Sequence, residues 1–195
     1  MNHIKIIEYV YSIKKFIAFA GLIFLIGIIC GYVLFQYFPA ETKIFYDKLA
    51  ENAHKAIDVN SPISLFFYIL FNNLLLSIFV LASGIIFGVL PFFELFFQGA
   101  ILGIAIYVVK ENVIWTKFLV RILPHGIIEI PIIIITGAIG LKIGALVFYE
   151  VFKKRKALKK EIFQALKFFC VAILPALIIS ALIEVFLTGK LVNMY

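Results

Sequence analysis

Two long stretches of this sequence contain no charged residue. Residues 16–40 and residues 59–93 lack Asp, Glu, Lys and Arg throughout. A run of about 20 apolar residues is long enough to cross the hydrocarbon core of a bilayer as a helix. The 195-residue chain is 64% hydrophobic and 15% charged, whereas soluble domains carry about 25% charged residues. We therefore interpret it as an integral membrane protein, which excludes a soluble enzyme, a disordered chain and a secreted disulfide scaffold.

Charged residues and prolines divide the chain into five predicted spans of a single all-α, polytopic helical bundle. The spans cover residues 16–38, 62–90, 92–109, 118–151 and 162–188. Residues 1–15 are amphipathic and predict an interfacial helix. Residues 41–60 predict a helical loop outside the bilayer, and residues 152–161 form a basic loop. Because the uncharged stretch 59–93 is too long for one span, we place the turn between the second and third spans at Pro91.

The basic residues set the predicted orientation. Residues 153–160 hold six Lys or Arg and no acidic residue, and such loops face the cytoplasm. Residues 41–60 are net acidic, with four acidic and three basic residues. We therefore expect a multi-pass protein of the cell membrane with a cytoplasmic N-terminus and an extracytoplasmic C-terminus. This distribution accounts for the net charge of +7, so we expect no nucleic-acid partner.

The fourth predicted span contains ionisable residues at membrane depth. Arg121, His125 and Glu129 recur every four positions and share one face of an ideal helix. Charges inside a bilayer are costly, so such residues are functional candidates. Two interpretations remain open: a polar knot that pairs internally and fixes helix packing, or a path for protons or ions. Pro124 and Pro131 interrupt the same segment and predict a kink or a break.

Amides and glycines on the neighbouring spans extend this pattern. Asn72, Asn73 and Gln98 need hydrogen-bond partners in lipid and complete the predicted polar cluster. Small residues at four-residue spacing predict seams where helix backbones approach closely. These packing glycines are Gly84, Gly88, Gly99, Gly103, Gly137, Gly140 and Gly144. So many seams for so few helices favour a homo-oligomer, most simply a two-fold dimer.

Motifs for catalysis and for cofactors are missing from the sequence. It has no HExxH, no Ser–His elbow, no paired intramembrane Asp and no GxxxxGK[ST] loop. His125 and Glu129 have helical ligand spacing, but a metal site needs three or four ligands. The other histidines, His3 and His54, lie outside the predicted spans. We therefore expect no enzyme activity, no metal and no cofactor.

Five short segments appear in an order that is typical of one family. They are Phe71-Asn72-Asn73, Gly84-Ile85-Ile86-Phe87-Gly88, Gln98-Gly99 with Gly103, Pro124-His125-Gly126-Ile127-Ile128-Glu129 and Gly137-Ala138-Ile139-Gly140. On these segments the chain resembles the stage II sporulation protein M family, SpoIIM, over roughly residues 15–188. The Pro-His-Gly-x-x-Glu run is the specific part. Gln98 stands where the family often has Asn, a change that keeps an amide.

The resemblance implies a polytopic membrane protein. In spore-forming bacteria the named member acts in engulfment with two partner proteins that degrade peptidoglycan, and many relatives occur in bacteria and archaea that do not sporulate. We therefore expect a non-enzymatic scaffold or assembly component for membrane or envelope remodelling, with the lipid bilayer and envelope proteins as partners. The alternative is a small oligomeric transporter or channel that uses the intramembrane polar cluster. Water reaching His125 would favour transport, and a dry, paired site would favour a scaffold.

Overall fold

The computed structural model describes residues 3–55, 61–111, 115–153 and 157–188. In chain order the elements are α1 (His3–Tyr37), α2 (Pro39–Lys55), α3 (Pro62–Ser83), α4 (Val89–Glu111), α5 (Trp115–Lys153), α6 (Leu158–Phe168) and α7 (Leu174–Ile183), with π-helical turns at Phe169–Ile173 and Glu184–Thr188. These described ranges contain no strand. The predicted all-α class is therefore confirmed.

Five helical segments are long and apolar enough to cross a membrane. They are Lys5–Tyr37, Pro62–Ser83, Val89–Val108, Gly126–Phe152 and Leu158–Phe186. Large apolar side chains on these segments are exposed, and Phe71, Leu75 and Ile127 are each more than half exposed. Such side chains belong in lipid rather than in water. The chain is an integral membrane protein.

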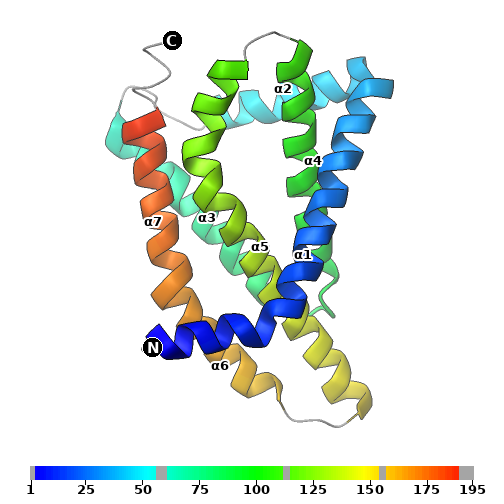
Figure 1. The fold of residues 1–195 in the computed structure, drawn as a ribbon, viewed down its shortest axis with the longest axis vertical. Helices are drawn as coiled ribbons and strands as arrows, with labels where there is room; N and C mark the ends of the chain where they lie inside the picture. The colour runs from blue at the N-terminus through cyan, green and yellow to red at the C-terminus, as the bar shows by residue number, and fades with distance from the viewer. Residues whose placement is uncertain (1–2, 56–60, 112–114, 154–156, 189–195) are drawn as a thin grey trace.

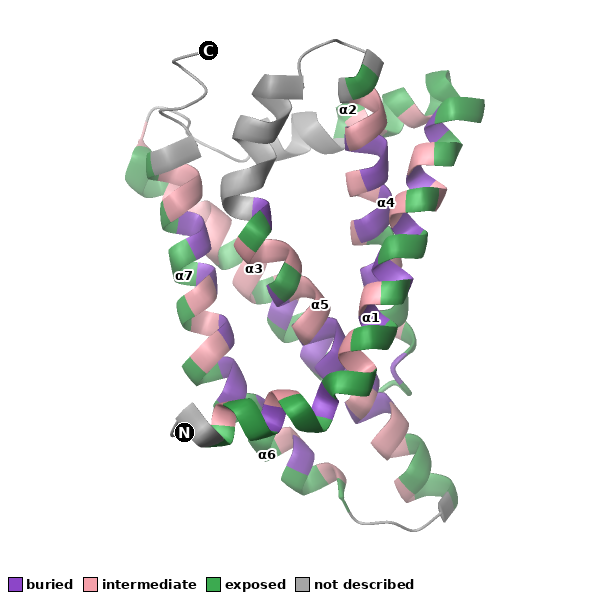
Figure 2. Cartoon of the chain, in the orientation of Figure 1, coloured by how far each residue is buried: buried purple, intermediate pink, exposed green. Residues whose placement is uncertain are grey.

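The central helix of the bundle is α5, which contacts α1, α3, α4, α6 and α7. In Figure 1, α1 and α4 run side by side on one flank of α5, while α3 and α7 lie on the other. Two buried clusters lie on different sides of α5: Ile139 belongs to the cluster that contains Leu177, and Ala138 to the cluster that contains Leu95. Figure 2 shows buried residues as stripes along helices whose other faces are exposed. The core therefore lies along α5, and the outer helices each bury one stripe against it.

The N-terminal helix is longer than predicted. α1 runs unbroken from His3 to Tyr37, across the predicted boundary between residues 15 and 16. The sequence has no Gly or Pro near that boundary, so nothing in the backbone ends the helix there. Figure 1 shows the first part of α1 lying across α6, and the remainder running beside α4. The predicted interfacial helix is therefore the first part of the first span's own helix.

The turn between the second and third spans comes earlier than predicted. α3 ends at Ser83 and α4 begins at Val89, so the prediction that this helix ends at Pro91 is wrong. The backbone reverses at Phe87 and Gly88, where φ is 52° and 74°. Pro91 instead lies in the first turn of α4 and is fully buried. A proline is tolerated there because the first backbone N–H groups of a helix have no partner within the helix.

The two prolines of the fourth span do not break it. α5 is continuous from Trp115 to Lys153 through Pro124 and Pro131, so of the two predictions, a kink or a break, the break is wrong. In a membrane protein, neighbouring helices and local adjustments re-satisfy the backbone groups that a proline frees. At about 1.5 Å per residue, α5 is about 58 Å long, nearly twice a hydrocarbon core of about 30 Å. One end of α5 must therefore extend beyond the bilayer.

The last predicted span contains a π-helical turn that the sequence analysis did not foresee. α6 passes into α7 through Phe169–Ile173, and Pro175 is in the first turn of α7. A proline lacks an N–H and clashes with the carbonyl four positions earlier, which here belongs to Val171. Widening the helix into a π turn relieves this clash. Figure 1 shows the chain changing direction between α6 and α7.

Candidate functional site

Glycines let the helix backbones approach closely, and these contacts fix the arrangement of the spans. On α4, a Cβ added to Gly99 would collide with the carbonyl oxygen of Phe24, and one added to Gly103 with that of Ile28. On α1, Gly31 meets Ala100 of α4 in the same way. Only glycine permits backbones to approach this closely. The predicted seam on α4 is therefore a contact with α1 of the same chain.

A second seam joins the α3–α4 turn to α5. A Cβ on Gly84 would lie 2.6 Å from the carbonyl oxygen of Gly140. A Cβ on Gly144 would collide with the backbone of Gly88. Gly137 lies under the side chain of Leu95 on α4, with no room for a Cβ. The structure thus places all the predicted packing glycines at contacts within one chain.

A buried ion pair joins three helices at one end of the bundle. Lys142 Nζ on α5 lies 2.7 Å from Glu161 Oε2 on α6, and the two side chains are only 15% and 7% exposed. Tyr9 Oη on α1 donates to the other carboxylate oxygen, Glu161 Oε1, at 2.8 Å. Lys142 Nζ also donates to Ser12 Oγ at 3.3 Å, and Ser12 Oγ donates to the Tyr9 carbonyl at 2.7 Å. We call these four residues the interfacial cluster.

Lysines surround the interfacial cluster. A groove of about 450 Å³ beside it is lined by Lys5, Glu8, Tyr9, Ser12, Lys160, Phe163, Gln164 and Lys167. Lysine side chains gather at the membrane surface, because their ammonium groups need water or phosphate while their stems tolerate lipid. The interfacial cluster therefore lies at the lysine-rich end of the bundle, and α5 continues beyond Lys142 to Lys153.

A small, mostly apolar cavity lies between α3, α4 and α5. Its volume is about 20 Å³, and its lining residues are Leu76, Ser77, Val80, Glu94, Leu95, Gln98, Ile133, Thr136 and Gly137. Such a volume is enough for about one water molecule. Thr136 precedes Lys142 by six positions on α5, which is about 9 Å along the helix axis. The cavity therefore lies beside the apolar segment Gly126–Phe152 of α5.

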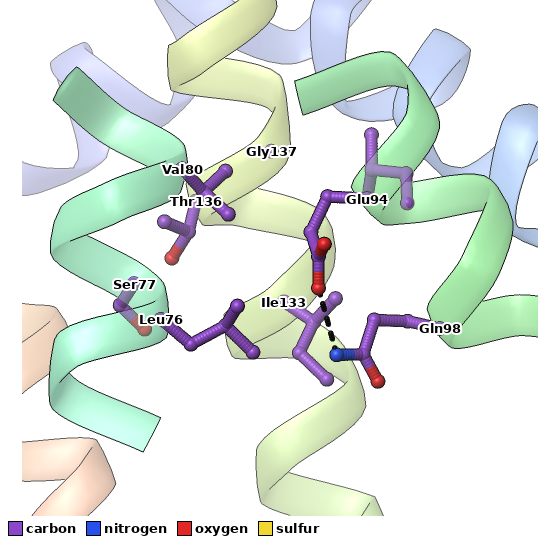
Figure 3. A pocket seen from close by; sticks show the side chains of 9 residues that line it. Leu76, Ser77, Val80, Glu94, Gln98, Ile133, Thr136 and Gly137 are labelled. Carbon is purple, nitrogen blue, oxygen red and sulfur yellow. Dashed lines mark hydrogen bonds between the residues drawn. The ribbon is translucent and has the colours of Figure 1, made fainter. Parts of the chain in front are cut away.

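Glu94 is the acidic residue of this cavity. Gln98, one turn later on α4, donates from Nε2 to Glu94 Oε1 at 2.9 Å. Figure 3 shows the Glu94 carboxylate on one side of the space, with the hydroxyls of Thr136 and Ser77 on the other. Glu94 and Gln98 pair with each other, whereas Lys142 and Glu161 form an ion pair elsewhere in the bundle. The hydroxyl of Thr136 is buried without a partner among the described residues.

The predicted trio on α5 is only partly described. The side chains of Arg121 and His125 lie outside the described residues, so their predicted pairing is not tested. Glu129 is half-buried and takes part in an interaction of its own. On α3, Asn73 is half-buried and Asn72 is exposed. Of the predicted polar residues whose side chains are described, Gln98 alone lines the cavity.

Sequence reasoning missed the most strongly paired groups. With the turn predicted at Pro91, Glu94 falls at the start of the third predicted span, residues 92–109. With the turn at residues 84–88, Glu94 lies inside the span, and its four-residue spacing from Gln98 was the available signal. Tyr9 and Glu161 are 152 positions apart, and no local pattern could have joined them.

Comparisons with known proteins agree on one family. A family model described as stage II sporulation protein M matches residues 20–189. An uncharacterized protein of Methanocaldococcus jannaschii is 34% identical over 173 residues, which is 87% of this chain and 92% of that protein. No solved structure matches the chain.

Proposed function

This chain belongs to the stage II sporulation protein M family, SpoIIM, and from that premise we propose that it is a non-enzymatic membrane scaffold. In this role it holds partner proteins at the membrane during remodelling of the membrane or envelope. The observation that supports the proposal most is the way its polar groups are used. The described ion pair ties three helices together, and the cavity between α3, α4 and α5 has room for about one water. Both arrangements favour a rigid framework over a solute path.

A candidate docking surface lies where α5 and α6 extend past the interfacial cluster. A mostly apolar groove of about 1040 Å³ is lined there by Glu150, Leu158, Lys159, Lys160, Ile162, Phe163 and Leu166. Phe163 and Phe152 are each about 60% exposed. Aromatic side chains exposed beside lysines suit a protein partner that combines apolar and acidic groups. The interfacial cluster holds α6 against α5 and so keeps this surface in shape.

Site-specific photo-crosslinking in cells of the native host tests the scaffold proposal. A photoreactive phenylalanine analogue replaces Phe163 in the groove, and the matched control replaces Phe71, an exposed aromatic on α3. We expect discrete protein adducts from position 163, identified by mass spectrometry, and lipid adducts alone from position 71. Glu161→Gln should weaken the adducts from position 163, because it loosens α6. Identical products from both positions would contradict the docking surface.

A transporter or channel is the second candidate function. Glu94, Gln98 and Thr136 face a shared space inside the membrane, and carboxylates at membrane depth often belong to ion or proton paths. The discriminating experiment is ion flux into liposomes that contain the purified protein. A scaffold predicts no Na⁺, K⁺ or proton flux above that of protein-free liposomes. Flux that disappears in Glu94→Gln would favour transport and would count against the scaffold proposal.

A further inference from the structure

We propose that the groove between α1 and α6 binds the phosphate headgroup of one anionic phospholipid. This lysine-lined groove has a volume of about 450 Å³ and lies where the first part of α1 crosses α6 (Figure 1). Lys5 and Tyr9 line it from α1, four positions apart, and Lys160, Gln164 and Lys167 line it from α6, four and three positions apart. Residues at these spacings lie on one face of a helix. Two helix faces, each with ammonium groups, therefore meet in one space.

The charge of the lining favours an anion. Three lysines line the groove, and Glu8 is the only acidic residue among the described residues of the lining. The carboxylate of Glu161, which follows Lys160 in the sequence, is already held by Lys142 and Tyr9. The lysines therefore exceed the acidic residues of the described lining, and like charges held close together repel each other. A phosphate group between the ammonium groups removes this repulsion.

An aromatic ring positions one of these lysines. Lys167 Nζ lies 4.2 Å from the centroid of the Phe163 ring, within the range of about 6 Å for a cation–π contact. Both residues line the groove, so the ring holds the ammonium group at its edge. Gln164 lies between them in the sequence and adds an amide N–H donor to the lining. Ammonium groups and N–H donors are the groups that bind phosphate oxygens.

The surroundings of the groove select a lipid over a soluble anion. Its two helices are the starting ends of the membrane-crossing segments Lys5–Tyr37 and Leu158–Phe186. On these ends Ile7, Phe163 and Leu166 are each more than half exposed. A free phosphate would leave such apolar side chains uncovered, whereas a phospholipid covers them with its acyl chains while its phosphate occupies the groove. Basic pockets between membrane helices recognise lipid headgroups through this combination.

Native mass spectrometry of the full chain in detergent tests the proposal. The probes are dioleoyl phosphatidylglycerol, which is anionic, and dioleoyl phosphatidylcholine, which has the same acyl chains and no net charge. We expect one phosphatidylglycerol per chain, bound roughly tenfold more tightly than phosphatidylcholine. Equal affinity for the two lipids would overturn the proposal.

Matched double variants assign the binding to the groove. Lys5→Gln with Lys167→Gln removes one ammonium group of the lining from each helix, so phosphatidylglycerol should bind roughly tenfold more weakly. Lys14→Gln with Lys159→Gln removes the same charge from the same helices, but neither residue lines the groove. Its affinity should stay within about twofold of the wild type. All four lysines are exposed, so both proteins should fold. Equal losses in the two double variants would overturn the assignment.

A variant of opposite sign guards against a general loss of structure. Glu8→Gln removes the acidic charge of the described lining, so phosphatidylglycerol should bind more tightly than to the wild type. A damaged fold cannot produce tighter binding. Weaker binding would show that the groove does not hold the phosphate and would overturn the proposal.

Inorganic phosphate distinguishes the two sources of the headgroup's chemistry. Added in large excess over the lipid at constant ionic strength, it should leave phosphatidylglycerol bound. Displacement of the lipid would assign the groove to a soluble anion and overturn the lipid proposal. None of these measurements involves a partner protein, and the variants leave Lys160 and Phe163 unchanged, which also line the proposed docking surface. The outcome is therefore independent of the scaffold proposal.

Discussion

Two carboxylates of this protein, the buried Glu161 and the half-buried Glu94, are held by different means. Glu161 accepts hydrogen bonds from a tyrosine and from a lysine ammonium, whereas Glu94 accepts one from an amide. In a buried ion pair, the attraction between the two charges offsets the free-energy cost of removing them from water. When one partner is lost, the other charge stays buried with nothing to offset that cost. The two residues should therefore respond differently to neutralisation. Glu94→Gln removes a charge that lacks a described protein counter-ion, and Glu161→Gln leaves Lys142 alone.

Neutralising Glu161 should destabilise the fold. We expect Glu161→Gln to lower the free energy of unfolding by about 3 kcal/mol, because Lys142 would keep its charge in a buried position. The double variant Lys142→Met with Glu161→Gln should recover much of this loss, since no charge then remains buried. Equilibrium unfolding in mixed detergent micelles measures both. Lys159→Met, which removes an exposed lysine of α6, is the control. A double variant as unstable as the single one would argue against the ion pair as the cause.

Two glycines of α1 should respond in opposite directions to the same substitution. Gly31→Ala should destabilise the protein by about 1–3 kcal/mol, because the new Cβ would overlap the carbonyl of Ala100 on α4. Gly21 has no heavy atom within 4 Å of an added Cβ, so Gly21→Ala should be neutral or stabilising by up to about 1 kcal/mol through helix propensity. Unfolding temperatures of the two variants, measured under the same conditions, test this difference in stability. Equal effects would mean that α1 and α4 do not meet at Gly31.

At the scale of elements, the α3–α4 turn depends on one backbone conformation. Gly88 has a φ of 74°, which residues with a Cβ adopt only at a cost. An added Cβ would lie 3.5 Å from Leu141 Cα, which is an ordinary contact. Backbone conformation, and not space, therefore requires glycine at this position. Because the turn separates α3 from α4, the glycine at position 88 helps to set where α3 ends and α4 begins.

Gly88→Ala should therefore reduce stability by about 1–2 kcal/mol, the usual cost of a left-handed backbone at a residue with a Cβ. Ile86→Ala is the control within the same turn, because Ile86 is exposed and its φ is not positive. Its effect should stay within about 0.5 kcal/mol. Thermal unfolding in detergent compares them. Tolerance of alanine at position 88 would show that the turn takes another conformation.

The sequence predicts the helices well and their meeting points poorly. Apolar length, divided by charged residues and prolines, identified five membrane helices, because lipid imposes one simple requirement on each of them. The turn at Gly88 was misplaced, since Pro91 is the stronger local signal and the glycine contacts with Gly140 and Gly144 are made by a distant helix. Glu94 was then assigned to a boundary rather than to a site. The pairing of Tyr9 with Glu161 depends on tertiary packing, which no local spacing records.

At the scale of the whole molecule, orientation follows from the distribution of basic residues. The interfacial cluster, the lysine-lined groove and the extended end of α5 lie at one end of the bundle. Lys159 and Lys160, which are part of the basic run 153–160, lie at that same end. A cytoplasmic position for it satisfies the preference of Lys and Arg for the inner face of the membrane. The predicted orientation has a cytoplasmic N-terminus and an extracytoplasmic C-terminus.

Labelling of single cysteines tests this orientation. Cys30 and Cys170 are first replaced by Ala, and one cysteine is then placed at position 48, 156 or 193. In intact cells an impermeant maleimide should label positions 48 and 193, whereas position 156 should react only after the membrane is opened. Reaction at position 156 from outside would reverse the orientation.

The two-fold dimer stays a prediction. The glycine seams that motivated it are occupied by contacts between α1 and α4 and between α5 and the α3–α4 turn. A dimer would therefore have to use other surfaces, such as the exposed faces of α3 and α7. We predict a mass of two chains in mild detergent, measured by light scattering or native mass spectrometry. Monomer alone in several mild detergents would contradict it.

The packing of α3 and α4 on α5 has a consequence for biosynthesis. The ribosome completes the α3–α4 hairpin before it reaches Gly140 and Gly144, which receive that hairpin's turn in the finished fold. Until α5 enters the membrane, Gly84 in the turn after α3 lacks the contact with Gly140 that it makes in the finished fold. By contrast, α1 can join α4 as soon as α4 is inserted. Of the two glycine contacts, the one between α1 and α4 can therefore form first during synthesis. The helix that becomes the centre of the bundle arrives afterwards, and the interfacial cluster closes only when Glu161 has been synthesised.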